Sequence, residues 1–200
     1  MKLHQFDEQD LQAFLRGRSG LQEKRDYVGI SVVVKCPAVA YDELTNGIEM
    51  TDQAHRMAYA GYLFERDTLE RMMQMGIAKK ATREVAAPFD RRLRGHNDGE
   101  TNWGDLLEIK SSSRDRFEKI VRDGKALFQH FAQVQLYMRY GPWKRAWIVY
   151  VCRDTLEHKV FEVRYRPDVA GKLEQRAKII LAALDTARRP VCECGHCGDA

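Results

Sequence analysis

Long hydrophobic runs are missing from this sequence. The longest uninterrupted apolar stretches, residues 146–152 and 179–184, are far shorter than the roughly 20 residues that a membrane-spanning helix needs. The N-terminus starts with a charged amphipathic stretch instead of an apolar signal region, and no segment repeats at a fixed period. We therefore expect a soluble, cytoplasmic chain with no membrane partner.

A strong charge of either sign is also missing. The 200 residues carry a formal net charge of +4, which permits contact with a phosphate backbone but does not identify a nucleic-acid-binding protein. With 44% hydrophobic and 31% charged residues, the chain has the balance of one compact domain with a core of its own. Disordered and fibrous architectures are therefore excluded.

Cysteine is scarce and odd in number. Three of the five cysteines fall within the last nine residues, which is not the pattern of a secreted disulfide framework. A metal or cluster site is the better first interpretation.

Apolar periodicity and turn residues predict an α/β chain with a mixed sheet. Helices are expected over residues 6–16, 51–76, 114–124, 125–140 and 168–189, and strands over 82–89, 93–98, 106–111, 145–152 and 159–165. The first three strands are expected to form a meander, connected by residues 88–91 and 99–105. Residues 30–34 allow two secondary structures, because three consecutive valines favour a strand whereas Ser31 could cap a helix that runs to Gly47.

The most informative segment contains two acids and a lysine. In a strand, successive side chains alternate between faces, so Glu108 and Lys110 share one side while Ile109 points to the core. If the preceding strand is a hairpin neighbour, Asp98 at its end approaches Glu108. A divalent cation would relieve the repulsion between the two carboxylates, and the resulting site suits phosphodiester hydrolysis.

Spacing on two helices adds to this set. Gly61 and Glu65 lie four residues apart on one face of the long helix, where the missing side chain would let the helix approach the sheet. Gln133 and Tyr137 share a face of a later helix in the same way. A second Glu-x-Lys set, Glu157 to Lys159, lacks the preceding strand that ends in Asp-Gly.

Four ordered motifs then resemble a known family. Gly61-x3-Glu65, Gly95-x2-Asp98, Glu108-Ile109-Lys110 and Gln133-x3-Tyr137 resemble the motif series of the PD-(D/E)XK nuclease superfamily. The nearest branch contains RecB-type nuclease domains, CRISPR-associated adaptation nucleases and YqaJ or lambda-exonuclease-like enzymes. The resemblance implies a restriction-endonuclease-like core and a metal-dependent DNA nuclease, more specifically an exonuclease that acts on DNA ends in recombination, repair, or CRISPR or phage DNA processing.

The resemblance also implies a role for each motif residue. Asp98 and Glu108, with the main-chain oxygen of Ile109, would bind Mg²⁺ or Mn²⁺, and Glu65 would complete the acidic cluster. Lys110 would position the attacking water. Gln133 and Tyr137 would brace the site or touch the DNA strand.

Two departures and a division of the chain complete this interpretation. Asn97 stands where the superfamily carries its proline, and Glu65 stands where some RecB-like members carry a histidine, which favours the YqaJ and lambda-exonuclease side. We expect one nuclease domain over residues 1–200, with an N-terminal helical part (1–50), a nuclease core (51–166) and a C-terminal helix with a Cys-rich tail (167–200). The host would be a bacterial or phage-infected cell.

The cysteines resemble a further feature of RecB-like nucleases, an iron-sulfur cluster held by one cysteine before the core and three after it. Cys36 with Cys192, Cys194 and Cys197 would supply these ligands, as a [4Fe-4S] cluster. Zinc held by three cysteines with His196 or Cys36, or a reduced tail without metal, are the alternatives. Cys152, in an apolar strand, is expected to be a small buried hydrophobe.

Charged and aromatic residues around the site suggest how DNA is held. Basic side chains flank the two acids on both sides, at Arg91, Arg92, Arg94, Arg114, Arg116, Lys119, Arg122 and Lys125. Trp103 either stacks on a base or packs on its own hairpin, and His55 and His96 are more often packed or surface histidines than ligands. A homo-oligomer or a nuclease or recombination partner protein is also compatible with these motifs. Alternative functions are an inactive nucleic-acid-binding or adaptor protein with this fold, and a zinc-stapled interaction domain.

Overall fold

The computed structural model describes residues 8–18, 26–48, 51–192 and 194. Its helices are α1 (Glu8–Arg18), α2 (Pro37–Asn46), α3 (Asp52–Gln74), α4 (Arg114–Asp123), α5 (Phe128–Tyr140) and α6 (Pro167–Thr186). Its strands are β1 (Val28–Gly29), β2 (Ala78–Lys79), β3 (Glu84–Ala87), β4 (Asp90–His96), β5 (Gly99–Thr101), β6 (Leu106–Ser112), β7 (Arg145–Cys152) and β8 (His158–Arg164). In this described part, no helix combines the length and apolar character that crossing a membrane requires.

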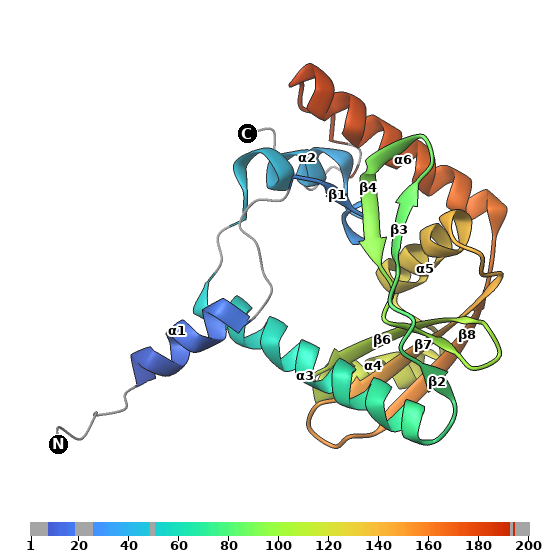
Figure 1. Cartoon of the computed structure of the whole chain (residues 1–200). Coiled ribbons are helices and arrows are strands. Elements are labelled where there is room, and N and C mark those ends of the chain that lie inside the picture. The colour runs from blue at the N-terminus through green and yellow to red at the C-terminus, as the bar shows by residue number, and fades with distance from the viewer. Residues whose placement is uncertain (1–7, 19–25, 49–50, 193, 195–200) are drawn as a thin grey trace.

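A five-stranded mixed sheet in the order β2-β5-β6-β7-β8 forms the centre of the fold (Figure 1). Within this sheet, only β6 and β7 run parallel, and α4 and α5 make the long connection that a parallel pair needs. The face that carries Leu106, Ile148 and Tyr150 packs against α4 and α5 in the large core. The opposite face carries Leu107, Ile109 and Val149, which pack beneath Leu69 and Met72 of α3. The alternation expected for β6 is therefore confirmed.

The predicted three-stranded meander is only half correct. β3 and β4 form the expected antiparallel hairpin, but β4 belongs to a second sheet of order β1-β4-β3 and does not pair with β6. The chain crosses between the sheets at Asn97, and the expected loop over residues 99–105 contains strand β5, which pairs with β6. The buried Asn97 side chain explains the crossing, because it accepts a hydrogen bond from Arg83 N (2.7 Å) and donates one to Gly99 O (2.8 Å).

Residues 30–34 are neither the strand nor the long helix. Val28 and Gly29 pair in parallel with β4, and a short 3-10 turn (Ile30–Val32) follows. Helix α2 begins only at Pro37, with Cys36 as its N-cap residue. The proline ring fixes a helical φ and removes an N–H that a first helical position does not need, so the helix starts there.

The long helix α3 begins where the sequence predicts. The Thr51 side chain accepts a hydrogen bond from Ala54 N (3.2 Å), and the helix ends just before the left-handed Gly76. Within α3, Thr68 is the single residue classed as buried. The helix packs on one face of the central sheet, over β6 and β7 and beside β2, and its outer side faces solvent.

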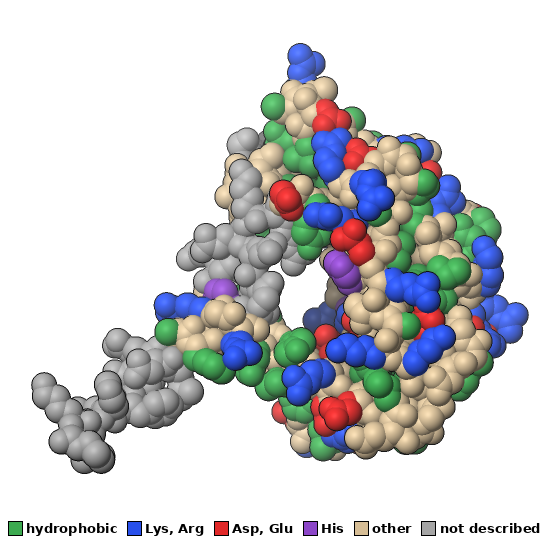
Figure 2. Space-filling model, in the orientation of Figure 1, with side chains coloured by type: hydrophobic (Ala, Val, Ile, Leu, Met, Phe, Trp, Pro, Cys, Tyr) green, Lys and Arg blue, Asp and Glu red, His purple; other side chains and the backbone are tan. Residues whose placement is uncertain are grey.

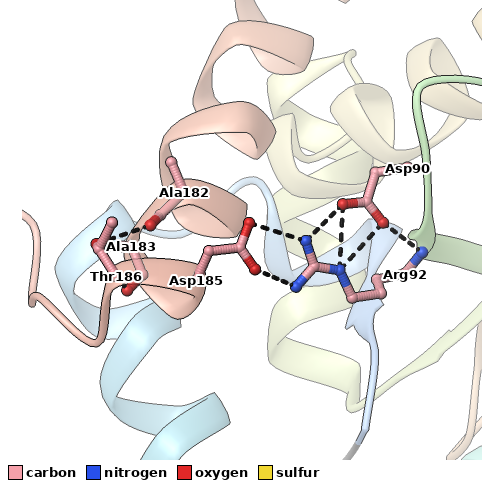
Figure 3. A network of polar contacts seen from close by, with 6 residues as sticks. All are labelled: Asp90, Arg92, Ala182, Ala183, Asp185 and Thr186. Atoms are coloured by element: carbon pink, nitrogen blue, oxygen red, sulfur yellow. Dashed lines mark hydrogen bonds and ion pairs between the residues drawn. The ribbon is translucent and has the colours of Figure 1, made fainter.

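An ion-pair network fastens the small sheet to the last helix. Figure 3 shows Arg92 of β4 between two carboxylates, Asp90 in its own hairpin and Asp185 in α6, with nitrogen to oxygen distances of 2.6 Å to each. Helix α6 packs along α5 and reaches α2, as Figure 1 shows. The N-terminal and C-terminal parts of the chain are thus joined on the side of α6.

Candidate active site and cysteine centre

The turn after Asn97 brings Asp98 to the middle of β6. Gly99 pairs with Leu107, so Asp98 lies opposite Glu108 across the short antiparallel pair. The Asp98 Oδ2 atom accepts a hydrogen bond of 2.7 Å from the backbone N–H of Ile109. The predicted approach of Asp98 to Glu108 is therefore present, although β5 provides it and β4 does not.

Glu108 and Lys110 form a buried ion pair. Only 1% of Glu108 is exposed, and its Oε1 lies 2.6 Å from Lys110 Nζ, which is also 3.9 Å from Asp98 Oδ2. Burial raises the pKa of Glu108, and Asp98 adds to the rise although Lys110 opposes it. Burial alone would lower the pKa of Lys110, but the surrounding carboxylates outweigh it and hold this pKa well above its ordinary value.

The second carboxylate oxygen of Glu108 has no partner. Its Oε2 is buried and makes no hydrogen bond among the described residues. An unsatisfied buried carboxylate oxygen is costly, so it marks a place where a cation or a donor from outside the chain would be stabilising.

Two side chains of helix α5 form hydrogen bonds around this ion pair. Gln133 Nε2 donates a hydrogen bond of 2.8 Å to Glu108 Oε1 and lies 3.4 Å from the Tyr137 hydroxyl. Tyr137 in turn donates to the main-chain oxygen of His96 at 2.6 Å. The predicted pair of α5 residues thus connects Glu108 with the end of β4, and burial raises the pKa of Tyr137 above its ordinary value.

Glu65 reaches the site from α3. Burial raises its pKa to about 6, and the charge of Asp98 acts in the same direction, whereas Lys110 and the backbone N–H of Ser111 act against it. A Cβ at Gly61 would stand 3.6 Å from Ser111 Oγ, which is ordinary van der Waals contact. The helix therefore does approach the sheet as expected, but an alanine would also fit at this position.

Two residues of the site were not predicted. Asn97, noted in the sequence only as a replaced proline, holds the backbone on both sides of Asp98, and its position in an Asn-Asp-Gly turn was the available signal. His130 lies one turn before Gln133, with Nδ1 2.8 Å from the Tyr150 hydroxyl. Burial lowers the pKa of His130 to about 3, and Lys110 adds to the effect. The spacing of residues 130, 133 and 137 on one helical face could have indicated it.

The histidine and the arginines of β4 differ in what their side chains contact. The His96 ring is exposed and 3.8 Å from Glu84, so His96 serves the site through its main-chain oxygen. Arg92 is held by Asp90 and Asp185, and Arg94 lies over the Tyr27 ring. These arginines take part in the packing of the small sheet, and Figure 2 shows Lys and Arg side chains interspersed with Asp and Glu on the face that is drawn.

Cysteines from the two ends of the chain meet on another side of the fold. The sulfur atoms of Cys36, Cys192 and Cys194 all lie within 4.8 Å of one another, and those of Cys192 and Cys194 are 3.4 Å apart. Arg189 pairs with Asp42 at 2.9 Å and so brings the tail to α2. Cys197 and His196 lie outside the described residues. Cys152 is fully buried in β7, which confirms it as a core residue.

A mixed sheet that presents acids and a lysine on one strand, with helices on both faces, is the restriction-endonuclease-like fold. No family model matches the chain, and no curated protein sequence matches it closely enough to count as a relative. Solved structures do match it. A crystal structure of an alkaline exonuclease from Laribacter hongkongensis has a TM-score of 0.65 at 18% identity, covering 88% of this chain and 93% of that chain.

Two further structures agree with this likeness. The same exonuclease in complex with dAMP has a TM-score of 0.64 at 17% identity, covering 90% of this chain and 93% of that chain. A phage-related exonuclease from Haemophilus somnus 129PT has a TM-score of 0.59 at 14% identity, covering 80% and 94%. At these identities the likeness is one of fold, and it confirms the fold that the four motifs imply.

Proposed function

We propose that this protein is a metal-dependent DNA nuclease that hydrolyses phosphodiester bonds at DNA ends. The observation that carries the proposal is the state of Glu108, a buried carboxylate with one oxygen held by Lys110 and Gln133 and the other without a hydrogen bond among the described residues. Three carboxylates around one ammonium leave an excess of negative charge that a divalent cation would balance.

The donor atoms fit a hard cation. Asp98, Glu108 and the main-chain oxygen of Ile109 would hold Mg²⁺ or Mn²⁺, and Glu65 would complete the cluster from α3. Such an ion, when bound, polarises a phosphoryl oxygen and lowers the pKa of its bound water. Burial is the main cause of the raised pKa values of Glu65 and Glu108, and the charge of Asp98 adds to both, so a divalent cation would favour the charged forms of these acids.

Lys110 supplies a fixed positive charge. Because its pKa is held well above the ordinary value, it stays protonated and can donate hydrogen bonds to the attacking water and to the phosphoryl oxygen. A preorganised charge of this kind stabilises the transition state more than the ground state. Its position 2.6 Å from Glu108 and 3.9 Å from Asp98 keeps it beside both acids.

Gln133 and Tyr137 act as positioning residues. The Gln133 amide holds one Glu108 oxygen, which leaves the other to face the metal position. The Tyr137 hydroxyl fixes the His96 carbonyl and so the start of the turn that presents Asp98. The two residues thus orient both acids from one helix.

The fold likeness supports the choice of substrate and reaction. Two proteins among the similar structures are described as exonucleases, and one of them was also solved with dAMP. We therefore favour cleavage at DNA ends, with residues 1–200 acting as one nuclease unit. A cytoplasmic location and a homo-oligomer or protein partner stay predictions.

Linear DNA incubated with the purified protein tests the proposal. We expect single- or double-stranded ends to be shortened in Mg²⁺ or Mn²⁺ and left intact with a chelator or in Glu108→Gln. A protein that binds DNA with a steep salt dependence but cleaves neither substrate in either metal would be an adaptor with this fold, and the nuclease proposal would be wrong.

We also propose that Cys36, Cys192 and Cys194, with Cys197, hold a structural metal centre. Sulfur ligands 2.3 Å from one tetrahedral zinc ion stand about 3.8 Å apart, close to the spacing of these three sulfurs. Thiolates also hold iron-sulfur clusters, so the donor atoms alone do not select between the two. A brown anaerobic sample that loses its colour in Cys194→Ser supports the cluster, a colourless sample with bound zinc supports zinc, and a sample with neither contradicts the centre.

A further inference from the structure

A buried carboxylate beside the candidate active site forms ion pairs with two basic side chains that face solvent. Glu100 of β5 is 4% exposed, with Oε2 3.2 Å from Lys79 Nζ and Oε1 3.3 Å from Arg83 Nε. The side chains of Lys79 and Arg83 are 50% and 59% exposed. Two cations on one carboxylate leave a positive charge in surplus at the surface.

The register of the strands places this group next to the acids of the site. Lys79 pairs with Glu100, and Glu100 pairs with Leu106, so Glu100 shares a sheet face with Asp98 two residues before it. Only β5 separates β2 from β6, which is a distance of about 10 Å between the outer strands. Lys79 therefore lies two strand spacings across from Leu106, which is two residues before Glu108.

Arg83 is tied to the same turn that presents Asp98. Its backbone N–H donates to Asn97 Oδ1 at 2.7 Å, and the neighbouring Thr82 Oγ1 lies 3.5 Å from the Asp98 carbonyl oxygen. Glu100 thus holds the Arg83 guanidinium, and the Asn97 side chain holds the Arg83 backbone. Figure 2 shows Lys and Arg side chains on this face over the segment that leads from β2 to β3.

We propose that Lys79 and Arg83, held by Glu100, form a phosphate-binding shelf for the DNA strand next to the scissile phosphate. The arginine fork suits two oxygens of a phosphodiester, and the lysine adds a point charge. Because Glu100 already orders both side chains, less conformational entropy is lost when a phosphate binds. The inference rests on the proposed nuclease function and extends it to where the strand lies.

DNA binding without cleavage tests the shelf. With a chelator present, we expect the double substitution Lys79→Ala and Arg83→Ala to weaken binding of a single-stranded oligonucleotide by about tenfold or more. The slope of log affinity against log salt should fall by about 0.7, the value for one phosphate on a single strand. The matched control is the pair Arg164→Ala and Arg166→Ala, which removes the same charge from two arginines that also pair with acids.

A second measurement locates the phosphate. Oligonucleotides with one methylphosphonate at successive positions remove a single negative charge each, and wild-type binding should weaken at one position close to the cleaved end. A methylphosphonate at that same position should not change the affinity of the double variant. If every substituted position weakens wild type and variant alike, or if the double variant loses no more affinity than the control pair, the shelf is wrong.

The two proposals fail in different ways. A wild-type protein that neither binds nor cleaves DNA contradicts the nuclease function itself, whereas cleavage with an unaffected double variant contradicts only the shelf. Should the double variant unfold because Glu100 loses its partners, the triple variant with Glu100→Gln removes the carboxylate charge as well and restores the comparison.

Discussion

Two acids near the start and the middle of β6, the half-buried Asp105 and the buried Glu108, differ in how their carboxylates are satisfied. Asp105, just before β6, accepts hydrogen bonds at one oxygen from Trp103 Nε1 (2.7 Å), Arg145 Nε (2.7 Å) and Trp147 Nε1 (2.9 Å). Glu108, three residues later, has two donors on one oxygen and none on the other. The Asp105 side chain is 13% exposed, whereas the second oxygen of Glu108 is buried and has no hydrogen bond among the described residues.

The Asp105 contacts join the β5–β6 turn to the first residues of β7, and the exposed Trp103 donates one of these hydrogen bonds. Asp105 is therefore a structural acid, whereas the proposed function makes Glu108 a metal ligand. Around Glu108, burial raises the pKa of both Glu108 and Glu65, and Asp98 adds to the rise while Lys110 opposes it. A cation bound there would offset this burial, as the proposed function requires of Glu108 and not of Asp105.

Replacing Lys110, the ammonium beside Glu108 and Asp98, should have the largest effect. Lys110→Ala is expected to lower kcat about 100- to 1000-fold, because a preorganised charge is lost at the transition state. Lys159→Ala is the control, since Lys159 lies on β8 over the Phe161 ring and takes no part in the site. Single-turnover cleavage of linear DNA measures both, and equal rates in the two variants would contradict the role of Lys110.

Removing Asp105 should act on stability and leave the chemistry intact. Asp105→Ala leaves two indole N–H groups and a guanidinium without their acceptor, so the free energy of unfolding should fall by about 2 kcal/mol. Urea denaturation measures this loss, with Asp168→Ala, at an exposed pair, as the control that loses less. A drop in kcat of the folded variant similar to that of Lys110→Ala would oppose the distinction between the two acids.

The smallest effect concerns pH. Glu65 has a folded-state pKa of about 6 against an ordinary value of 4.5, so the folded protein holds this proton more tightly than the unfolded chain does. The free energy of unfolding of the metal-free protein should therefore fall, by on the order of 1 kcal/mol, as pH rises from about 4.5 to about 6. Glu65→Gln should lack this fall. An unchanged pH profile in the variant would show that Glu65 is not in the acidic cluster.

Much of the fold follows from patterns within single elements. Helices α3, α4, α5 and α6 and strands β7 and β8 lie within a few residues of their predicted bounds, because caps and apolar periodicity act locally. Strands β2 and β5 have two and three residues, too few to show an alternation. The pairing of β5 with β6 depends on Asn97, whose buried contacts join residues far apart in the chain.

The candidate site shows the same limit. Strand alternation placed Glu108 and Lys110 on one face, and helical spacing placed Gln133 beside Tyr137, as the structure has them. What spacing does not give is the partner of each side chain. The contact of Tyr137 with the His96 carbonyl and the link from Asp105 to Arg145 arise from packing between distant elements.

Gly95 shows how a residue without a side chain governs the site from outside it. A Cβ at this position would stand 2.8 Å from the Tyr137 hydroxyl oxygen and 3.3 Å from Ile30 Cβ. Even a single methyl group would displace the phenol, and the loop that carries the aspartate would lose its anchor. Saturation mutagenesis at codon 95 should thus recover glycine alone among fully active clones, although this residue has no side chain with which to contact metal or nucleotide.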